Sequence, residues 1–273
     1  MILIYTQGGI FMSNDTTNNF SVLNTDLPES VDNALKNLTD LPSKNVGQTL
    51  SDCWFLVFGG ISQLAEKRKL KYAKDLEEFK QSLSSKITSI PEENRVEANT
   101  QIVMPALENA KYCVEEPSLR KMFANLISSS LDIEKQDIVH PSFSDILKTM
   151  TPLDAQNLKL IFDNYQLPIC NIVRTSDDPS LYAVVLQNIF LENSECTIYE
   201  RQSLSISFLS KQGLVEIPSS LSINDDAAYF KYEQCDEMLQ IQNQYPDYTF
   251  QLQKRLVKPT PLGISFLDIC CPD

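Results

Sequence analysis

The sequence contains little glycine and a single histidine, and these shortages restrict the chemistry that it can support. Seven glycines occur in 273 residues, without the G-x-x-x-x-G-K-[ST] or G-x-G-x-x-G pattern, which disfavours a glycine-rich phosphate loop. His140 is the one histidine, and no cysteines form a C-x-x-C pair. Zinc sites usually need several such ligands at short spacings. We therefore expect neither a metal site nor a bound cofactor.

Positive charge is also in short supply. The chain has 23 lysines and arginines against 36 aspartates and glutamates, which gives a net charge of −13. An acidic surface opposes binding to the phosphate backbone of nucleic acids, so such binding would need a local basic patch. The sequence starts without the basic region of a secretory signal, and its seven cysteines are scattered. We expect a cytoplasmic protein with reduced thiols.

The sequence divides into three parts by composition. Residues 1–45 are rich in Asn, Asp, Thr and Ser and predict a flexible leader. Within it, Met12 is the expected natural start, because Gly8 and Gly9 could be translated from a ribosome-binding sequence just upstream of that codon. Residues 46–163 predict a helical domain, and residues 164–273 a winged-helix-like α+β domain. The predicted fold class is therefore mainly α with a smaller α+β part, a helical bundle followed by a winged-helix-like domain.

The helical domain is predicted from apolar residues spaced three and four apart. One long helix is expected to end before Pro91, with its apolar face formed by Tyr72, Leu76, Phe79, Leu83, Ile87 and Ile90. Prolines favour the first turn of a helix, and further helices are predicted near Pro105, Pro117 and Pro141. Thr151 and Asp154 are spaced as a capping box that opens a fourth.

The pattern changes after residue 164. Short β-branched and aromatic runs predict strands, and a helix over Tyr199–Gln212 is predicted to end at Gly213. A strand at Leu214–Ile217, a polar loop, a returning strand, a turn at Pro259–Pro261 and a final helix should follow. Helix, strand, returning strand and helix form the outline of a winged-helix module.

Winged helices often bind DNA, and this chain offers a few candidate contacts. The candidate recognition helix carries Arg201 and Lys211, and the returning strand carries Lys254 and Arg255. Few cations on a strongly acidic chain weigh against nucleic acid as a partner.

The segment Cys53–Lys74 joins an apolar run to a basic cluster. Its candidate contact residues are Trp54, Phe55 and Phe58 in the run and Lys67, Arg68, Lys69 and Lys71 in the cluster. The run is too short to span a bilayer. The segment could lie at a membrane surface, peripheral to the inner face of the membrane. The favoured alternative is a helix packed on the core with a solvated basic side.

His140 lies next to Pro141, and this pair has a structural explanation. A proline pushes the preceding residue out of the helical region, so His140 is predicted at the N-cap of a helix and Pro141 at its first position. A catalytic histidine would need a partner acid and a nucleophile or metal nearby. We favour the structural role.

Several stretches together resemble the Abi-alpha family, a bacterial family named for abortive phage infection. They are Met104–Leu107, Leu119–Leu126, His140–Phe143, Thr151–Ala155 and the closing "TPLGISFLDIC". The resemblance covers roughly residues 48–271, and "LRKMFANL … HPSF" is its specific part. It departs from the family pattern at Lys121, where an acid is common, at Leu153-Asp154 and at Pro261.

The resemblance implies a role in antiviral defence, in which growth arrest or death of the host limits phage spread. It implies no defined reaction. The motif residues are expected to be structural: Arg120, Phe123, Asn125, His140 and Pro141.

The sequence shows no catalytic constellation. Arg120 and His140 are too far apart for the ribonuclease pattern that sets Arg and His four to six residues apart, and G-x-S-x-G is absent. Glu78-Phe79-Lys80 matches the E-x-K of restriction-type nucleases but falls on a predicted helix instead of a strand. We therefore expect a non-enzymatic defence protein that acts through a protein partner or self-association. The alternatives are a membrane-surface effector docking through Cys53–Lys74 and a DNA-binding regulator of a defence locus.

Overall fold

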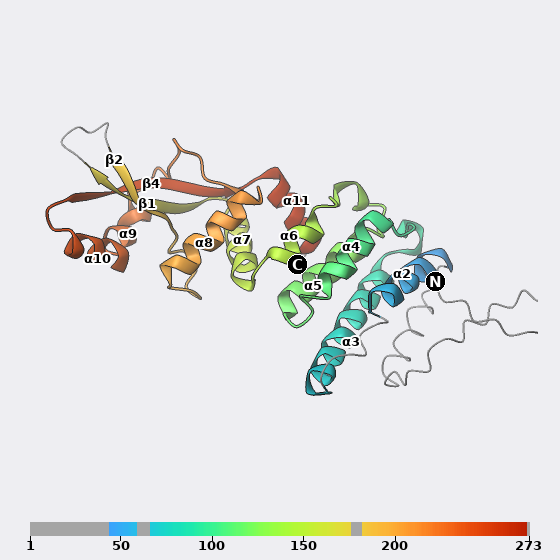
Figure 1. The fold of residues 1–273 in the computed structure, drawn as a ribbon. Coiled ribbons are helices and arrows are strands. Elements are labelled where there is room, and N and C mark those ends of the chain that lie inside the picture. The colour runs from blue at the N-terminus through green and yellow to red at the C-terminus, as the bar shows by residue number, and fades with distance from the viewer. Residues whose placement is uncertain (1–43, 59–65, 176–181, 272–273) are drawn as a thin grey trace, which may run out of the picture.

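The computed structural model describes residues 44–58, 66–175 and 182–271. Its elements are arranged along one long axis, with helices α2–α6 at one end and the sheet at the other (Figure 1). Helices α7, α8 and α11 lie between the two ends (Figure 1). Residues 1–43, which make up most of the predicted leader and include Met12, fall outside the described residues. The last two residues of that leader begin α2 at Lys44.

The helical end follows the predicted periodicity. Its elements are α2 (Lys44–Phe58), α3 (Glu66–Ser89), the 3₁₀ turn η1 (Glu92–Asn94), α4 (Thr100–Ala110), α5 (Pro117–Ser129), the 3₁₀ turn η2 (Gln136–Ile138), α6 (Phe143–Thr149) and α7 (Pro152–Asn164). On α3, Phe79, Leu83 and Ile87 are buried in the core, as the three-and-four spacing predicted. None of the described helices is both long enough and apolar enough to cross a membrane.

Two of the predicted helix starts are confirmed. Helix α5 begins at Pro117, whose missing N–H would have had no partner in the first turn. Helix α7 begins after Thr151 with the predicted capping box. Thr151 Oγ1 accepts the Asp154 N–H, and the Asp154 carboxylate accepts the Thr151 N–H. The aspartate thus accepts the N-cap N–H, as glutamate usually does in this motif.

Two other helix starts were predicted wrongly. Helix α4 begins at Thr100, not near Pro105, because the Asn99 side chain accepts the Gln101 N–H and caps the helix more than a turn earlier. Helix α6 begins at Phe143, while Pro141 lies in the turn before it. In both places a polar side chain upstream of the proline accepts a backbone N–H near the boundary.

The described strands form a four-stranded antiparallel sheet with the order β2-β1-β4-β3. They are β1 (Leu167–Thr175), β2 (Tyr182–Ile189), β3 (Val215–Glu216) and β4 (Thr249–Pro259). The central pair, β1 and β4, is in register from Leu167 opposite Val257 to Thr175 opposite Thr249. Residues Leu167–Thr175 belong to the segment whose β-branched residues predicted strands.

Both faces of the central strand β1 are covered. On one face, β1 residue Ile169 joins the larger apolar cluster, which extends back through α7 and α5 to α2. On the other face, Cys170 and Ile172 join a smaller cluster with Tyr229 and Tyr232. Alternate residues of one strand therefore enter two different cores, as the two-residue period of a strand requires.

The sequence predicted a polar loop after Ile217, but much of this stretch is helical. That stretch contains the 3₁₀ turn η3 (Asp226–Tyr229), α9 (Phe230–Glu233) and α10 (Asp236–Gln244). Tyr229 and Tyr232 are fully buried against the sheet, and each hydroxyl donates to a strand carbonyl, that of Arg255 and that of Pro168 respectively. Burying these rings outweighs the polar composition, because large aromatic side chains contribute most to a core.

The C-terminal helix packs closely on the start of β3. Helix α8 (Tyr199–Lys211) ends before Gly213, whose φ of 73° confirms the predicted helix stop. Helix α11 (Pro261–Cys270) is capped by Thr260, which accepts the Gly263 N–H. A Cβ on Gly263 would lie 2.0 Å from the Leu214 carbonyl oxygen. Only glycine therefore permits this contact.

The structure confirms a mainly α fold with a smaller β part. The predicted elements of the winged-helix outline, α8, β3, β4 and α11, occur in the expected order, but β4 pairs mainly with β1. The division into 46–163 and 164–273 stays a prediction. The larger apolar cluster crosses it, and so do buried hydrogen bonds from Asn157 to Gln202 and Ser205.

Candidate functional site

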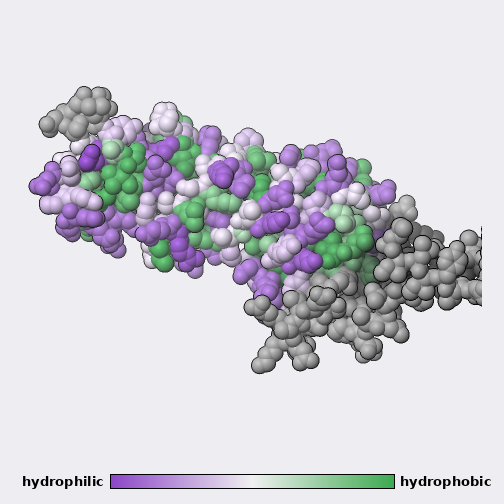
Figure 2. Space-filling view, viewed as in Figure 1, coloured by the Kyte–Doolittle hydropathy of each residue, from purple (hydrophilic) through white to green (hydrophobic). Residues whose placement is uncertain are grey.

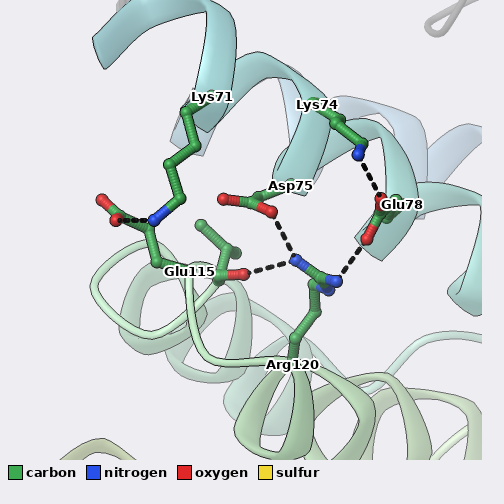
Figure 3. A network of polar contacts seen from close by, with 7 residues as sticks. Lys71, Lys74, Asp75, Glu78, Glu115 and Arg120 are labelled. Carbon is green, nitrogen blue, oxygen red and sulfur yellow. Dashed lines mark hydrogen bonds and ion pairs between the residues drawn. The ribbon is translucent and has the colours of Figure 1, made fainter.

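Arg120 on α5 joins two helices through ion pairs (Figure 3). Its side chain is 10% exposed, and it donates to Asp75 Oδ1 at 2.9 Å, to the Val114 carbonyl at 2.8 Å and to Glu78. Asp75 and Glu78 belong to α3, so one guanidinium group holds α3 against α5 by charge-assisted hydrogen bonds. The E-x-K triplet that begins at Glu78 lies on α3, and the Glu78 carboxylate is paired with Arg120.

Two further family-motif residues point inward. Phe123 is fully buried in the larger apolar cluster. Asn125 is 1% exposed, and its Nδ2 donates to the carbonyl oxygen of Cys270 at 2.7 Å. This bond ties the end of α11 to the middle of α5.

His140 is exposed and forms part of a local turn. Its Nδ1 accepts the Ser142 N–H at 3.2 Å and lies 2.7 Å from Ser142 Oγ. The Phe143 N–H is bonded to the His140 carbonyl. The imidazole therefore satisfies a backbone N–H just ahead of α6, a role that polar side chains commonly play at helix starts. A proline disfavours the helical conformation at the residue before it, and His140 lies outside α6.

The apolar run at Cys53–Lys74 presents one face to the core. Trp54 is 4% exposed and Phe58 is 5% exposed, with ring centroids 4.5 Å apart. Phe55 and Leu56 are 55% and 72% exposed on the same helix. Of the three aromatic candidates, Phe55 is thus the one whose ring is available to a partner.

The basic cluster that follows is only partly described. Lys71 forms an ion pair with Glu115 at 3.0 Å (Figure 3). This hydrogen bond and the carboxylate raise the pKa of the Lys71 ammonium. Lys67, Arg68 and Lys69 belong to α3, but their side chains lie outside the described residues.

The candidate nucleic-acid residues do not form a free basic patch. Arg201 and Lys211 are exposed on α8. Lys254 forms an ion pair with Asp226 at 2.7 Å, and Arg255 donates to the Ile217 carbonyl. The two residues of β4 are therefore engaged inside the molecule.

Two hollows lie along one face of α5. The larger, about 490 Å³, lies where α5, α7 and the end of α11 meet, and the smaller, about 250 Å³, lies between α3 and the end of α5. Asn125 lines both. Residues three and four apart share a helix face, so Ser118, Lys121, Met122, Asn125, Ser128 and Ser129 follow this face from one hollow to the other.

Among the described residues, no three His, Cys, Asp or Glu side chains are grouped so that they could hold a metal ion. Burial raises the pKa of the Cys170 thiol to about 12 and that of Cys270 well above its usual value. Thiols in that state are poor nucleophiles at neutral pH.

The comparisons agree with the family suggested by the sequence. Residues 71–270 match the family described as abortive infection alpha. The chain belongs to that family. No curated protein and no solved structure matches the chain significantly. The match begins at Lys71, so most of the segment Cys53–Lys74 lies before it.

Sequence reasoning found the motif residues but missed the hollows. The family motif contains Lys121 and Asn125, whereas no sequence signal marks Lys86 and Lys135. They lie on α3 and beside η2, and the chain between them carries no pattern that predicts their approach. Charge spacing would not have found both, because Lys86 has no acid three or four residues away but Lys135 has Asp132 three residues before it.

Proposed function

We propose that this chain is an antiviral protein of the abortive-infection type that acts in the bacterial cytoplasm through protein contacts. The observation that supports this most directly is the family match over residues 71–270. The buried motif residues Arg120, Phe123 and Asn125 join α3, α5 and α11 into one scaffold. Such a scaffold would present surfaces to a partner and needs no catalytic group.

The surface that best fits a protein partner or a second copy of the chain is the outer face of α2. Figure 2 shows hydrophobic residues as small patches between hydrophilic ones on the face drawn. On α2, Phe55 and the adjacent Leu56 are both more than half exposed. Exposed aromatic and aliphatic side chains that adjoin one another are typical of interaction sites. Because α2 precedes the family match, this contact would be particular to this chain.

Phage challenge tests the defence function. Bacteria carrying the gene or an empty vector are infected at low and at high multiplicity. We expect low-multiplicity cultures to survive and high-multiplicity cultures to collapse before progeny phage appear. Equal lysis of both strains by several unrelated phages would contradict the proposal.

Matched variants test the contact surface in the same assay. Phe55→Ser with Leu56→Ser should remove protection while leaving the thermal unfolding midpoint within about 2 °C, because exposed apolar side chains contribute little to stability. Leu204→Ser on α8 changes an equally exposed leucine, 72% exposed, and should keep protection. Full protection by the α2 double variant would exclude this surface.

A membrane-surface effector is the first alternative. With Trp54 and Phe58 buried, docking would depend on Phe55, Leu56 and the basic cluster. Sedimentation with vesicles containing anionic lipid tests it, with the α2 double variant as control. A wild-type protein that stays in the supernatant, and in the soluble fraction of infected cells, would rule the alternative out.

A winged-helix DNA-binding regulator is the second alternative. It draws support from the order of α8, β3 and β4 and from exposed Arg201 and Lys211 on α8. The ion pair between Lys254 and Asp226 weighs against it. A gel-shift assay at low salt, with DNA from the neighbouring locus, would show retardation that is lost in Arg201→Gln with Lys211→Gln.

A further inference from the structure

The smaller hollow on α5 collects lysines in an otherwise acidic chain. Lys86 and Lys135 line it, and Lys121 lies one helical turn before Asn125, which lines both hollows. Burial lowers the pKa of the Lys86 ammonium, and the charges of Lys121 and Lys135 lower it further. Lys86 is therefore close enough to Lys121 and to Lys135 to be repelled by each of them.

These three lysines have no carboxylate partner within the described part of the chain. Lys71, Lys159, Lys231, Lys254 and Lys258 each form an ion pair there. None of the described ion pairs or further interactions involves the ammonium group of Lys86, Lys121 or Lys135 with an acid. On a chain of net charge −13, three adjacent unpaired cations are an arrangement that an anion would stabilise.

The described acidic side chains that line the hollows do not form ion pairs with these three lysines. Asp132 lines the smaller hollow, but its Oδ1 accepts the backbone N–H of Glu134. In the larger hollow, Asp163 forms an ion pair with Lys159, and Glu195 lines this hollow but not the smaller one. Of the two hollows, the smaller one is thus lined by more basic than acidic side chains.

Asn125 supplies a second, independent sign of a ligand. Its Nδ2 is fixed by the Cys270 carbonyl, which leaves Oδ1 as a buried acceptor with no hydrogen-bond partner in the described structure. A buried acceptor without a donor costs about 1–3 kcal/mol. A ligand that donates an N–H or O–H at the junction of the two hollows would remove that cost.

One part of the wall of the larger hollow is apolar and suits an uncharged, flat group. Met122 and Leu160 provide apolar surface there, beside the small side chain of Ala155. Methionine sulfur makes favourable contacts with aromatic rings. The larger hollow alone, at about 490 Å³, has a volume typical of small-molecule sites.

We propose that the joined hollows bind a mononucleotide, with its phosphate held by Lys86, Lys121 and Lys135 and its base lying between Met122 and Leu160. An N–H of the base or an O–H of the ribose would donate to Asn125 Oδ1. Because the sequence has no glycine-rich loop, the phosphate would be held by side chains in place of backbone N–H groups. The inference stands on this geometry and goes beyond the proposed defence function.

Isothermal titration calorimetry of the purified full chain tests the proposal. The probes are AMP, GMP, CMP and UMP, their nucleosides, and inorganic pyrophosphate. At least one monophosphate should bind with a Kd below about 1 mM, and its nucleoside at least about tenfold more weakly, because charge-assisted hydrogen bonds to phosphate are then lost.

Two variants separate the phosphate end from the base end. Lys86→Gln with Lys135→Gln should weaken the monophosphate at least about tenfold, while Lys211→Gln on α8 should leave it unchanged. Ala155→Phe fills the larger hollow, so it should weaken the monophosphate but not pyrophosphate. Both lysine substitutions relieve repulsion and should keep the protein folded, which thermal unfolding checks.

Several results would overturn the proposal. They are the absence of binding by all four monophosphates, unchanged binding after the double lysine substitution, and pyrophosphate binding as tight as that of every monophosphate. The last result would reveal a plain anion site without a place for the base. Because no phage enters these assays, their failure would leave the defence function untouched.

Discussion

Replacing Arg120 with methionine should destabilise the fold through charge alone. Methionine is long and apolar, so it fills most of the space while removing the guanidinium group. Asp75, whose side chain is 13% exposed, would keep a buried carboxylate with no partner, because its Oδ2 already lacks one in the described structure. Removing one member of a buried pair costs about 3–5 kcal/mol. Glu78 is 43% exposed and water would solvate it, so we expect the lower end, about 3 kcal/mol.

Equilibrium unfolding in urea, followed by far-UV circular dichroism, measures this loss. A change of about 3 kcal/mol corresponds to a fall of roughly 6–12 °C in Tm for a chain of this size. Arg120→Met with Asp75→Leu removes both charges and should recover more than half of the stability. Lys74→Met is the matched control. Lys74 is 76% exposed and lies 3.7 Å from Glu78, so its loss should cost less than about 0.5 kcal/mol.

Two outcomes would refute the reasoning. One is an Arg120→Met protein that unfolds at the wild-type urea concentration, which would mean that the pair adds nothing to stability. The other is strict additivity, in which Asp75→Leu costs as much in the Arg120→Met background as in the wild type. Residues that interact must show a coupling energy in such a cycle.

Three further predictions follow from burial and backbone geometry. Gly263→Ala should lower the free energy of unfolding by about 3 kcal/mol or more, because the new Cβ would overlap a backbone oxygen. Gly213→Ala should lower it by about 1 kcal/mol, because Gly213 has a positive φ. Urea unfolding compares the two variants, and equal losses of stability would contradict the close packing at Gly263. Lys80 is 3% exposed with no hydrogen-bond partner for Nζ in the described structure, and burial lowers its pKa. The folded state then releases this proton more readily than the unfolded state. The buried ammonium group therefore destabilises the fold most below its lowered folded-state pKa, and this effect disappears as the pH rises past the unfolded value of 10.5. Lys80→Met should stabilise the fold by about 1–3 kcal/mol at pH 7, and a gain that does not shrink towards high pH would contradict burial of the charge as its cause. A thiol reagent should label the half-buried Cys196 within minutes and Cys170 only on unfolding, as peptide mapping by mass spectrometry would show; early labelling of Cys170 would mean that the sheet opens locally.

Local signals predicted the fold where one residue decides the outcome. Pro117 and Pro152 each follow an extended residue and open helices as expected. Near Pro105 the same rule failed, because the Asn99 side chain caps α4 more than a turn earlier. Near Pro141 it failed by two residues, and there the His140 side chain accepts the N–H of Ser142, the residue before α6. Proline permits a helix start, but it does not by itself determine which residue begins the helix.

Helix phase would have improved one prediction. Trp54 and Phe58 are four residues apart and therefore share a face, whereas Phe55 lies about 100° away from Trp54 around the helix. All three were predicted as contact residues, but Trp54 and Phe58 pack in the core, where Trp54 also lies against Phe79. The four-residue spacing alone is enough to predict that Trp54 and Phe58 are buried together.

The hollows could not be predicted, because their residues come from distant segments. Lys86 lies on α3, Lys121 on α5 and Lys135 just before η2, and each looks like an ordinary solvated lysine in its own segment. Only the packing of α3 against α5, fixed in part by Arg120, brings the three charges together. Their repulsion is a property of the fold.

The hydrogen bond from Asn125 to Cys270 spans 145 residues of chain. Phe143 and Phe266, which are also far apart in the sequence, pack against each other with ring centroids 5.2 Å apart. During synthesis, α5 leaves the ribosome long before α11, and a domain cannot complete its core until all of its segments are available. At about 5–20 residues per second, the emerging α5 waits many seconds for its last partner. A chain cut short before α11 would therefore have an incompletely packed helical end, although every residue of that end has already been made.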